Sequence, residues 1–211
     1  MSASAPYSTQ LAERLAAFRL KDVPPEVVAH AKLILLDTIG AMLAASNRKY
    51  SATRILVDFA RKVGGRPESS LVGQGVKTSC VHAALVNGTL GYYCDIEPHH
   101  VGGILHAPAV AVPTALALTE KEGASGARFL EAMLLGVEVT CRLSYAINPT
   151  SLYNRGFHPS AICGAFGAAA AAGHLFRLKA PRFAIALGLA MQQACGLLAW
   201  ASDHTENSRP F

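Results

Sequence analysis

Long apolar runs at helical spacing alternate with short polar loops along most of this chain. Alanine and leucine dominate the runs, whereas aromatic and β-branched residues are modest in number, and this composition favours helices over strands. Apolar residues at intervals of three and four predict core helices after Pro24-Pro25, over residues 26–46, and over residues 127–147. The last run, residues 183–201, carries no charge, but Gln192 and Gln193 lie at its centre. It predicts a buried helix rather than a membrane span.

Capping and turn residues divide the rest of the chain into further helices. Ser79 and Ser125 are suited to begin helices, and Gly64-Gly65 is suited to end one. The further helices are expected at about residues 9–21, 51–63, 80–94, 109–122 and 161–176. Residues 69–79 predict a short extended connection, because Gly73-x-Gly75 lacks the spacing of a phosphate-binding loop. Without repeats or a low-complexity linker, residues 1–211 are expected to form a single all-α, bundle-like domain.

Composition and charge narrow the classes of function. The formal charge of +5 is spread along the chain, so no dense Lys/Arg block indicates nucleic acid binding. Five cysteines without a CxxC pair are expected to be reduced thiols. A signal peptide has a basic region followed by an apolar core, and the N-terminal residues of this chain do not show that pattern. These features predict a cytoplasmic protein with no membrane segment and a small-molecule ligand.

Two polar loops between apolar helices carry the candidate chemistry. The segment Asn87–Pro108 and the segment Tyr153–Ser160 both contain histidine next to small or turn-forming residues. Ionisable groups are rarely placed beside an apolar scaffold unless they are paired or used. We therefore expect the two loops to form the walls of one pocket.

The two histidines that immediately precede apolar helices are the best acid/base candidates. His106 and His158 could exchange protons near neutral pH or donate to a substrate carboxylate. Asp95 could orient one of them or take the proton itself, and Arg155 could grip a carboxylate with two hydrogen bonds. The alternative is structural: each histidine caps the helix that follows it or bonds a carbonyl group.

A metal site is the weaker interpretation of the first loop. His99-His100 lies beside Asp95 and Glu97, which are possible zinc or iron ligands. Adjacent histidines usually cannot both turn toward one ion, however, and no H-E-x-x-H pattern is present, so no metal is expected. Three further histidines lie on predicted helices and are expected to be surface or internally bonded residues: His30, His82 and His174.

The motifs of both loops, in order, resemble those of the MmgE/PrpD family. The segments are NGTLGYYCDIEPHH at 87–100, the run from HAPAVAVP at 106–113, and RGFHPSAICGAFGAAAAAGHLFRL at 155–178. The family includes 2-methylcitrate dehydratase and cis-aconitate decarboxylase. The resemblance implies a mostly helical large domain, a smaller α+β lid with the active site between them, a homodimer, and no metal or other cofactor.

The resemblance also assigns roles to individual residues. It implies that Asp95, His106 and His158 occupy catalytic positions. His99 stands where a threonine is usual, and Arg209 stands near a lysine position, so both are expected to bind substrate together with Arg155.

These features predict a lyase that removes water or carbon dioxide from a small polycarboxylate, or a related isomerase, by histidine-assisted proton abstraction. The chain ends where the resemblance places the lid, so a separate lid chain is a possible partner and the chain by itself is expected to be incomplete. Two alternatives stay open: a non-catalytic helical scaffold that dimerises or binds a ligand, and a metal-dependent hydrolase.

Overall fold

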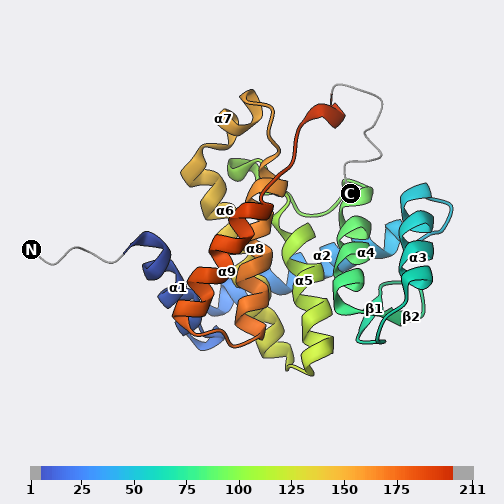
Figure 1. Ribbon diagram of the computed structural model, residues 1–211, viewed down its shortest axis with the longest axis horizontal. Helices are drawn as coiled ribbons and strands as arrows, with labels where there is room; N and C mark the ends of the chain where they lie inside the picture. The colour runs from blue at the N-terminus through green and yellow to red at the C-terminus, as the bar shows by residue number, and fades with distance from the viewer. Residues whose placement is uncertain (1–5, 202–211) are drawn as a thin grey trace, which may run out of the picture.

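The computed structural model describes residues 6–201, and most of them are helical (Figure 1). The all-α fold predicted from the sequence is therefore confirmed. The helices are α1 (Tyr7–Ala17), α2 (Pro25–Ala45), α3 (Ser51–Val63), α4 (Cys80–Tyr93), α5 (Ala107–Glu122), α6 (Gly126–Ile147), α7 (Pro149–Asn154), α8 (Pro159–Leu175) and α9 (Ala180–Gln193). Short 3-10 helices lie at Leu20–Asp22, Val101–Gly103 and Ala199–Ala201. Two strands, β1 (Ser69–Leu71) and β2 (Val76–Thr78), form an antiparallel hairpin.

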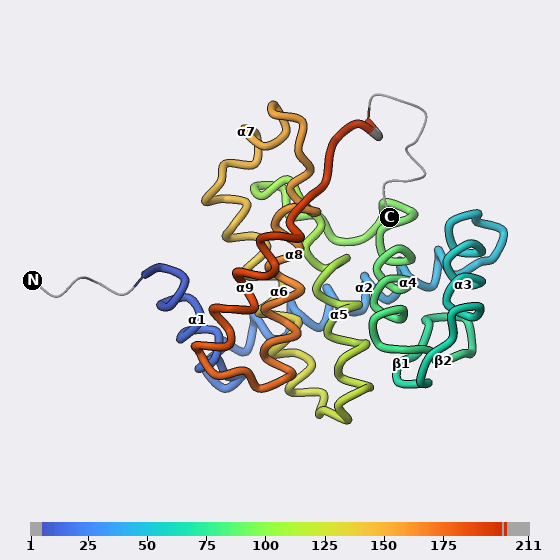
Figure 2. The backbone as a smooth tube through the Cα atoms, in the orientation of Figure 1, coloured from blue at the N-terminus to red at the C-terminus, as the bar shows by residue number. Residues whose placement is uncertain are grey.

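Helices α4, α5, α6 and α8 form the centre of the molecule. Helix α5 packs against the other three, and α6 and α8 make the most extensive contact of any pair. Helix α2 crosses behind α4 and α5, with α3 and the hairpin on one side and α1 and α9 on the other (Figures 1 and 2). This arrangement brings the beginnings of α5 and α8 next to the end of α4, where the two polar loops lie.

Glycines allow α6 and α8 to approach closely. A Cβ atom on Gly167 of α8 would lie 2.6 Å from the carbonyl oxygen of Gly136 on α6 and would also clash with Thr140. A Cβ on Gly136 would lie 2.8 Å from the methyl group of Ala111 on α5. Such distances are below van der Waals contact, so any larger residue would force the helices apart. The Ala/Gly-rich sequence of α8 is thus explained by packing.

The short extended connection expected at residues 69–79 forms the β1–β2 hairpin. Gly73 and Gly75 have φ values of +70° and +64° in its turn, which glycine adopts without strain. The side chain of Asn87, fully buried on α4, holds the hairpin: its Oδ1 accepts from the Val72 N–H, and its Nδ2 donates to the Ser70 carbonyl, both at 2.9 Å. The glycine pair therefore belongs to a turn and not to a phosphate loop.

The last helix differs from the prediction. Helix α9 ends at Gln193 instead of continuing to residue 201, and only Phe183 and Leu187 on it are buried. Ile185 and Leu189, in contrast, are 62% and 61% exposed. The helix is apolar on its outer face as well as on its buried face, and the uncharged run alone does not distinguish such a helix from a fully buried one.

Helix α2 is also less buried than its sequence suggests. Met42 is fully buried, but Leu36 and Leu43 are 69% and 52% exposed, so only part of the core helix predicted over residues 26–46 is buried. By length and composition alone α2 could cross a membrane. A core helix of a soluble protein can be equally long and apolar, so these two properties do not by themselves indicate a membrane span.

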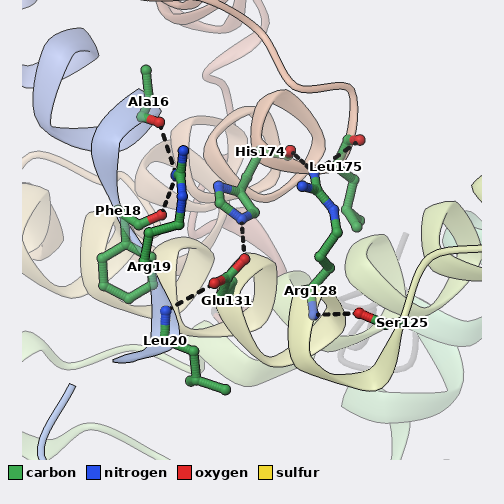
Figure 3. Close-up of polar contacts among 9 residues, drawn as sticks. All are labelled: Ala16, Phe18, Arg19, Leu20, Ser125, Arg128, Glu131, His174 and Leu175. Carbon is green, nitrogen blue, oxygen red and sulfur yellow. Dashed lines mark hydrogen bonds and ion pairs between the residues drawn. The ribbon is translucent and has the colours of Figure 1, made fainter. Parts of the chain in front are cut away.

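A buried polar cluster fixes the first 3-10 helix to the centre of the fold (Figure 3). Oε1 of Glu131 on α6 accepts a hydrogen bond from the Leu20 N–H, and Oε2 lies 2.8 Å from Nε2 of His174 on α8. Arg128 donates to the carbonyl group of His174 at 2.6 Å. Burial opposes ionisation of Glu131, but the hydrogen bonds from Leu20 and His174 outweigh it and hold the pKa of Glu131 below its ordinary value of 4.5. His174 is thus an internally bonded histidine, as expected.

Replacing Glu131 by glutamine is expected to lower the free energy of unfolding by about 1–3 kcal/mol at pH 7, because a buried partner of His174 loses its charge. The pKa of this carboxyl group is lowered in the folded state, so its contribution is fully present above pH 4.5 and is lost as the pH falls below that value. Denaturant unfolding at pH 7 and pH 3 checks both statements. Glu138→Gln, at an exposed position of the same helix, is the matched control and should change the free energy of unfolding little. Equal stability of Glu131→Gln and wild type at pH 7 would contradict the assignment.

Candidate active site

A cavity of about 250 Å³ opens between the end of α4 and the beginnings of α5 and α8. The structure brings the two polar loops together there, since His106 and His158 both line the cavity. Its polar lining residues are Thr89, Tyr92, His106, Thr114, His158 and Ser160. Its other lining residues are small or apolar: Ala84, Leu85, Gly88, Ala109, Val110, Pro113 and Ala161. A small cavity with a few convergent polar groups is typical of a small-molecule site.

Both histidines occupy the position that precedes a helix, but neither side chain caps it. The backbone N–H of His106, at the N-cap of α5, donates to Ser160 Oγ at 3.1 Å. The backbone N–H of His158, at the N-cap of α8, donates to the carbonyl group of Gly196 at 3.1 Å. Gly196 has a φ of +152° and no room for a Cβ beside Ala161. The backbone therefore fixes both histidines, and their imidazole rings do not serve as caps.

Glu97 is the nearest carboxylate to His106. Its side chain is fully buried, and its Oε1 lies 2.9 Å from Nδ1 of His106. Neither carboxylate oxygen of Glu97, nor Nδ1 of His106, makes a hydrogen bond of good geometry with any described residue, so the contact between the two side chains is electrostatic. A buried carboxylate is costly unless it is paired, so His106 is the group that compensates it. In this position Glu97 can balance the positive charge of an imidazolium at His106.

Asp95, expected to be the orienting carboxylate, lies further away. Its Oδ1 is 3.7 Å from Nε2 of His106, beyond hydrogen-bond distance, and its side chain is 54% exposed. The backbone of Asp95 has a φ of +53°, which turns the chain sharply after α4. Two residues later, this turn places Glu97 inside the protein and next to the imidazole.

His99 and Arg155 do not lie where charged anchors for the substrate were expected. The ring of His99 packs 4.7 Å from that of His106, and partial desolvation, together with the neighbouring His106, lowers the pKa of His99 below 6.5. It is therefore mostly neutral at pH 7, which weakens it as a carboxylate anchor. Arg155 is exposed at the end of α7 and does not line the cavity. Arg209 lies outside the described residues.

Tyr92 is a residue of the site that the sequence did not single out. It is 8% exposed, and its hydroxyl lies 3.2 Å from Nε2 of His158. Its ring also meets the ring of His106 edge-on, with centroids 5.0 Å apart and an interplanar angle of 87°. Tyr92 thus contacts both histidines. Gly88 and Thr89, four and three residues before it on α4, also line the cavity, and this helical spacing is the signal that could have indicated it.

The cysteines near the site are protonated at neutral pH. Burial raises the pKa of both Cys141 and Cys163 to about 11. Burial and then the charge of Glu97 also raise the pKa of Cys94. The thiolate is the reactive form of cysteine, so these three residues are poor nucleophiles.

Among residues 6–201, one group of side chains is close enough together to hold a metal ion. The candidate ligand atoms of Asp95, Glu97 and His106 lie within 4.8 Å of one another. However, Glu97 approaches Nδ1 of the imidazole and Asp95 approaches Nε2. A single ion can bind only one of these two nitrogens, so this arrangement fits a histidine between two carboxylates better than a metal centre.

We therefore expect the purified protein to contain no stoichiometric transition metal, and we expect any turnover measured with it to be retained after treatment with a chelator. Elemental analysis and assays before and after dialysis against EDTA test this. A bound metal that is lost together with activity, and restores it when added back, would instead support the metal-dependent hydrolase.

The geometry defines an all-α domain with two backbone-fixed histidines at a small pocket, suited to acid/base chemistry. The chain belongs to the MmgE/PrpD family, because residues 9–211 match the model of the MmgE/PrpD N-terminal domain. It is 29% identical over 203 residues to the cis-aconitate decarboxylase-like protein oryM of Aspergillus oryzae, covering 91% of this chain and 41% of that protein. It is 29% identical to the cis-aconitate decarboxylase of Aspergillus terreus, covering 84% of this chain and 37% of that enzyme. For human cis-aconitate decarboxylase the identity is 27%, over 85% of this chain and 38% of the enzyme. The chain thus spans about two fifths of the length of these relatives.

Proposed function

We propose that this chain is the N-terminal domain of a lyase that acts on a small polycarboxylate. The reaction is loss of carbon dioxide or water, or a related isomerisation. The observation that carries the proposal is the pair of histidines on one cavity, one backed by the buried Glu97 and the other bonded to Tyr92. The similarity to a cis-aconitate decarboxylase and to a cis-aconitate decarboxylase-like protein supports the substrate class.

The proposed chemistry is proton transfer beside a carboxylate. Loss of carbon dioxide leaves an electron pair that must be protonated at carbon, and elimination of water begins with removal of a proton from carbon. One acid/base set serves either reaction. In this proposal His106, held by Glu97, and His158 transfer protons or stabilise the negative charge that develops. Asp95 takes part from the Nε2 side of His106.

The substrate anchors and the assembly are also part of the proposal. No lysine or arginine lines the cavity within residues 6–201, so a polycarboxylate needs cationic partners from elsewhere. We assign this role to Arg155 and Arg209, together with groups of a lid domain or separate lid chain, whereas the neutral His99 would contribute a hydrogen bond to the substrate. The active protein is proposed to be a cytoplasmic homodimer that uses no cofactor.

The first experiment is to determine the intact mass and solution size of the natural gene product and to assay it with cis-aconitate and 2-methylcitrate. A product about twice the length of this chain, or a second chain that co-purifies with it, together with turnover of either acid, is the expected result. A stable protein of this length that turns over neither acid would contradict the proposal.

That second outcome would favour a non-catalytic scaffold. The specific observation behind this alternative is the exposed apolar surface on two helices. Leu33 and Leu36 on α2, and Ile185, Leu189 and Met191 on α9, are each more than 60% exposed. Exposed apolar surfaces of this kind often mark sites of association.

A further inference from the structure

The hydroxyl group of Tyr92 contacts Nε2 of His158, the ring nitrogen through which His158 would otherwise exchange a proton with the substrate. Nε2 of His158 lies 3.2 Å from this hydroxyl, and the His158 residue is only 7% exposed. A ring nitrogen that is hydrogen-bonded to a tyrosine hydroxyl cannot at the same time bond a substrate atom. The ring of Tyr92 lines the cavity, so the phenol is placed to meet a ligand there.

We infer that Tyr92 is a catalytic residue that relays protons between His158 and the substrate. This inference rests on the proposed function. In proton delivery, the O–H bond of Tyr92 breaks as a C–H bond forms on the substrate carbon. The Nε2–H bond of protonated His158 breaks at the same time, and its proton restores the phenol. Tyrosine and histidine both end neutral, the substrate carbon has gained one proton, and the reverse sequence removes a proton from carbon.

The surroundings of the phenol agree with such a role. A buried tyrosine hydroxyl normally needs a hydrogen-bond partner, and histidine is the side chain best suited to exchange a proton with it near neutral pH. The rings of Tyr92 and His106 meet in a T-shaped contact, and Nδ1 of His106 lies 2.9 Å from Oε1 of Glu97. Two acid/base groups, His106 and the relay from His158, thus reach the same cavity by separate routes.

The test uses Tyr92→Phe in the full-length protein, assayed with the acid that the wild type turns over. Phenylalanine keeps the ring and removes only the hydroxyl, so folding should be retained, as circular dichroism can verify. We expect kcat to fall by about 100-fold or more, with a much smaller change in KM. Tyr93→Phe, which makes the same chemical change at the next residue of α4, is the matched control and should retain most of its kcat, because Tyr93 packs against Tyr50 and does not line the cavity.

A second measurement separates a relay from a purely structural hydroxyl. Incorporation of 3-fluorotyrosine at position 92 keeps the hydroxyl and its shape but makes the phenol more acidic. A relay predicts that the alkaline limb of the kcat profile moves to lower pH, whereas a structural hydroxyl leaves the profile in place.

The possible failures are distinguishable. If the wild-type protein turns over neither acid, the proposed function is overturned, and the relay with it. If the wild type is active and His158→Ala is inactive, but Tyr92→Phe keeps wild-type kcat, only the relay is overturned. An unchanged pH profile in the fluorinated protein likewise rejects the relay and leaves the proposed function standing.

Discussion

Replacing His158 by alanine is expected to reduce kcat by about 10²- to 10⁴-fold, the usual contribution of a positioned acid or base, while the protein stays folded. The expectation of intact folding has a structural reason. The imidazole makes no capping bond to α8, and the contact that fixes this position is the bond from the His158 backbone N–H to the Gly196 carbonyl group. Alanine keeps that backbone bond and removes only the group that faces Tyr92.

Steady-state kinetics with the full-length protein, together with thermal unfolding, check this prediction. His30→Ala is the matched control, because His30 is an exposed histidine on α2 that does not line the cavity. The control should keep wild-type kcat. Unchanged turnover in His158→Ala would end the assignment of this histidine.

The helices could be predicted because helix formation leaves a local signal. Apolar spacing and caps such as Ser79 and Ser125 are visible in the sequence, and both serines do accept the expected bonds from the first turn of their helices. Burial could not be predicted as well. The run after Phe183 is uncharged, yet α9 ends at Gln193 and exposes Ile185, because the partner of each face is decided by tertiary packing.

The site could be predicted in part, for a similar reason. His106 and His158 were recognisable as polar groups next to apolar helices, which is a local feature. The role of Glu97 was not, because the positive φ of Asp95 decides which carboxylate turns inward. Tyr92 was hidden in an apolar run, since a tyrosine among alanines and leucines has the same pattern whether it packs in a core or faces a cavity.

Asp95 and Glu97 both lie near His106, and the second large loss of kcat is expected from the variant that removes the charge of Glu97. Glu97→Gln is expected to reduce kcat by about 10²- to 10⁴-fold. Glutamine has nearly the same shape, but it removes the negative charge 2.9 Å from Nδ1 of His106. The imidazolium formed when His106 takes a proton would then have no buried counter-charge, and the orientation of the ring would be less well defined.

Asp95→Asn is the matched comparison, because it makes the same chemical change two residues earlier in the same loop. The Asp95 side chain is half-exposed and 3.7 Å from Nε2, so water screens its charge, and the expected loss of kcat is smaller, about tenfold. Measured kcat values for the two variants therefore rank the carboxylates directly. A greater loss of kcat in Asp95→Asn than in Glu97→Gln would return the orienting role to Asp95. Glu97 would then serve packing alone. In that case burial and proximity to the imidazole would not identify the carboxylate that assists His106.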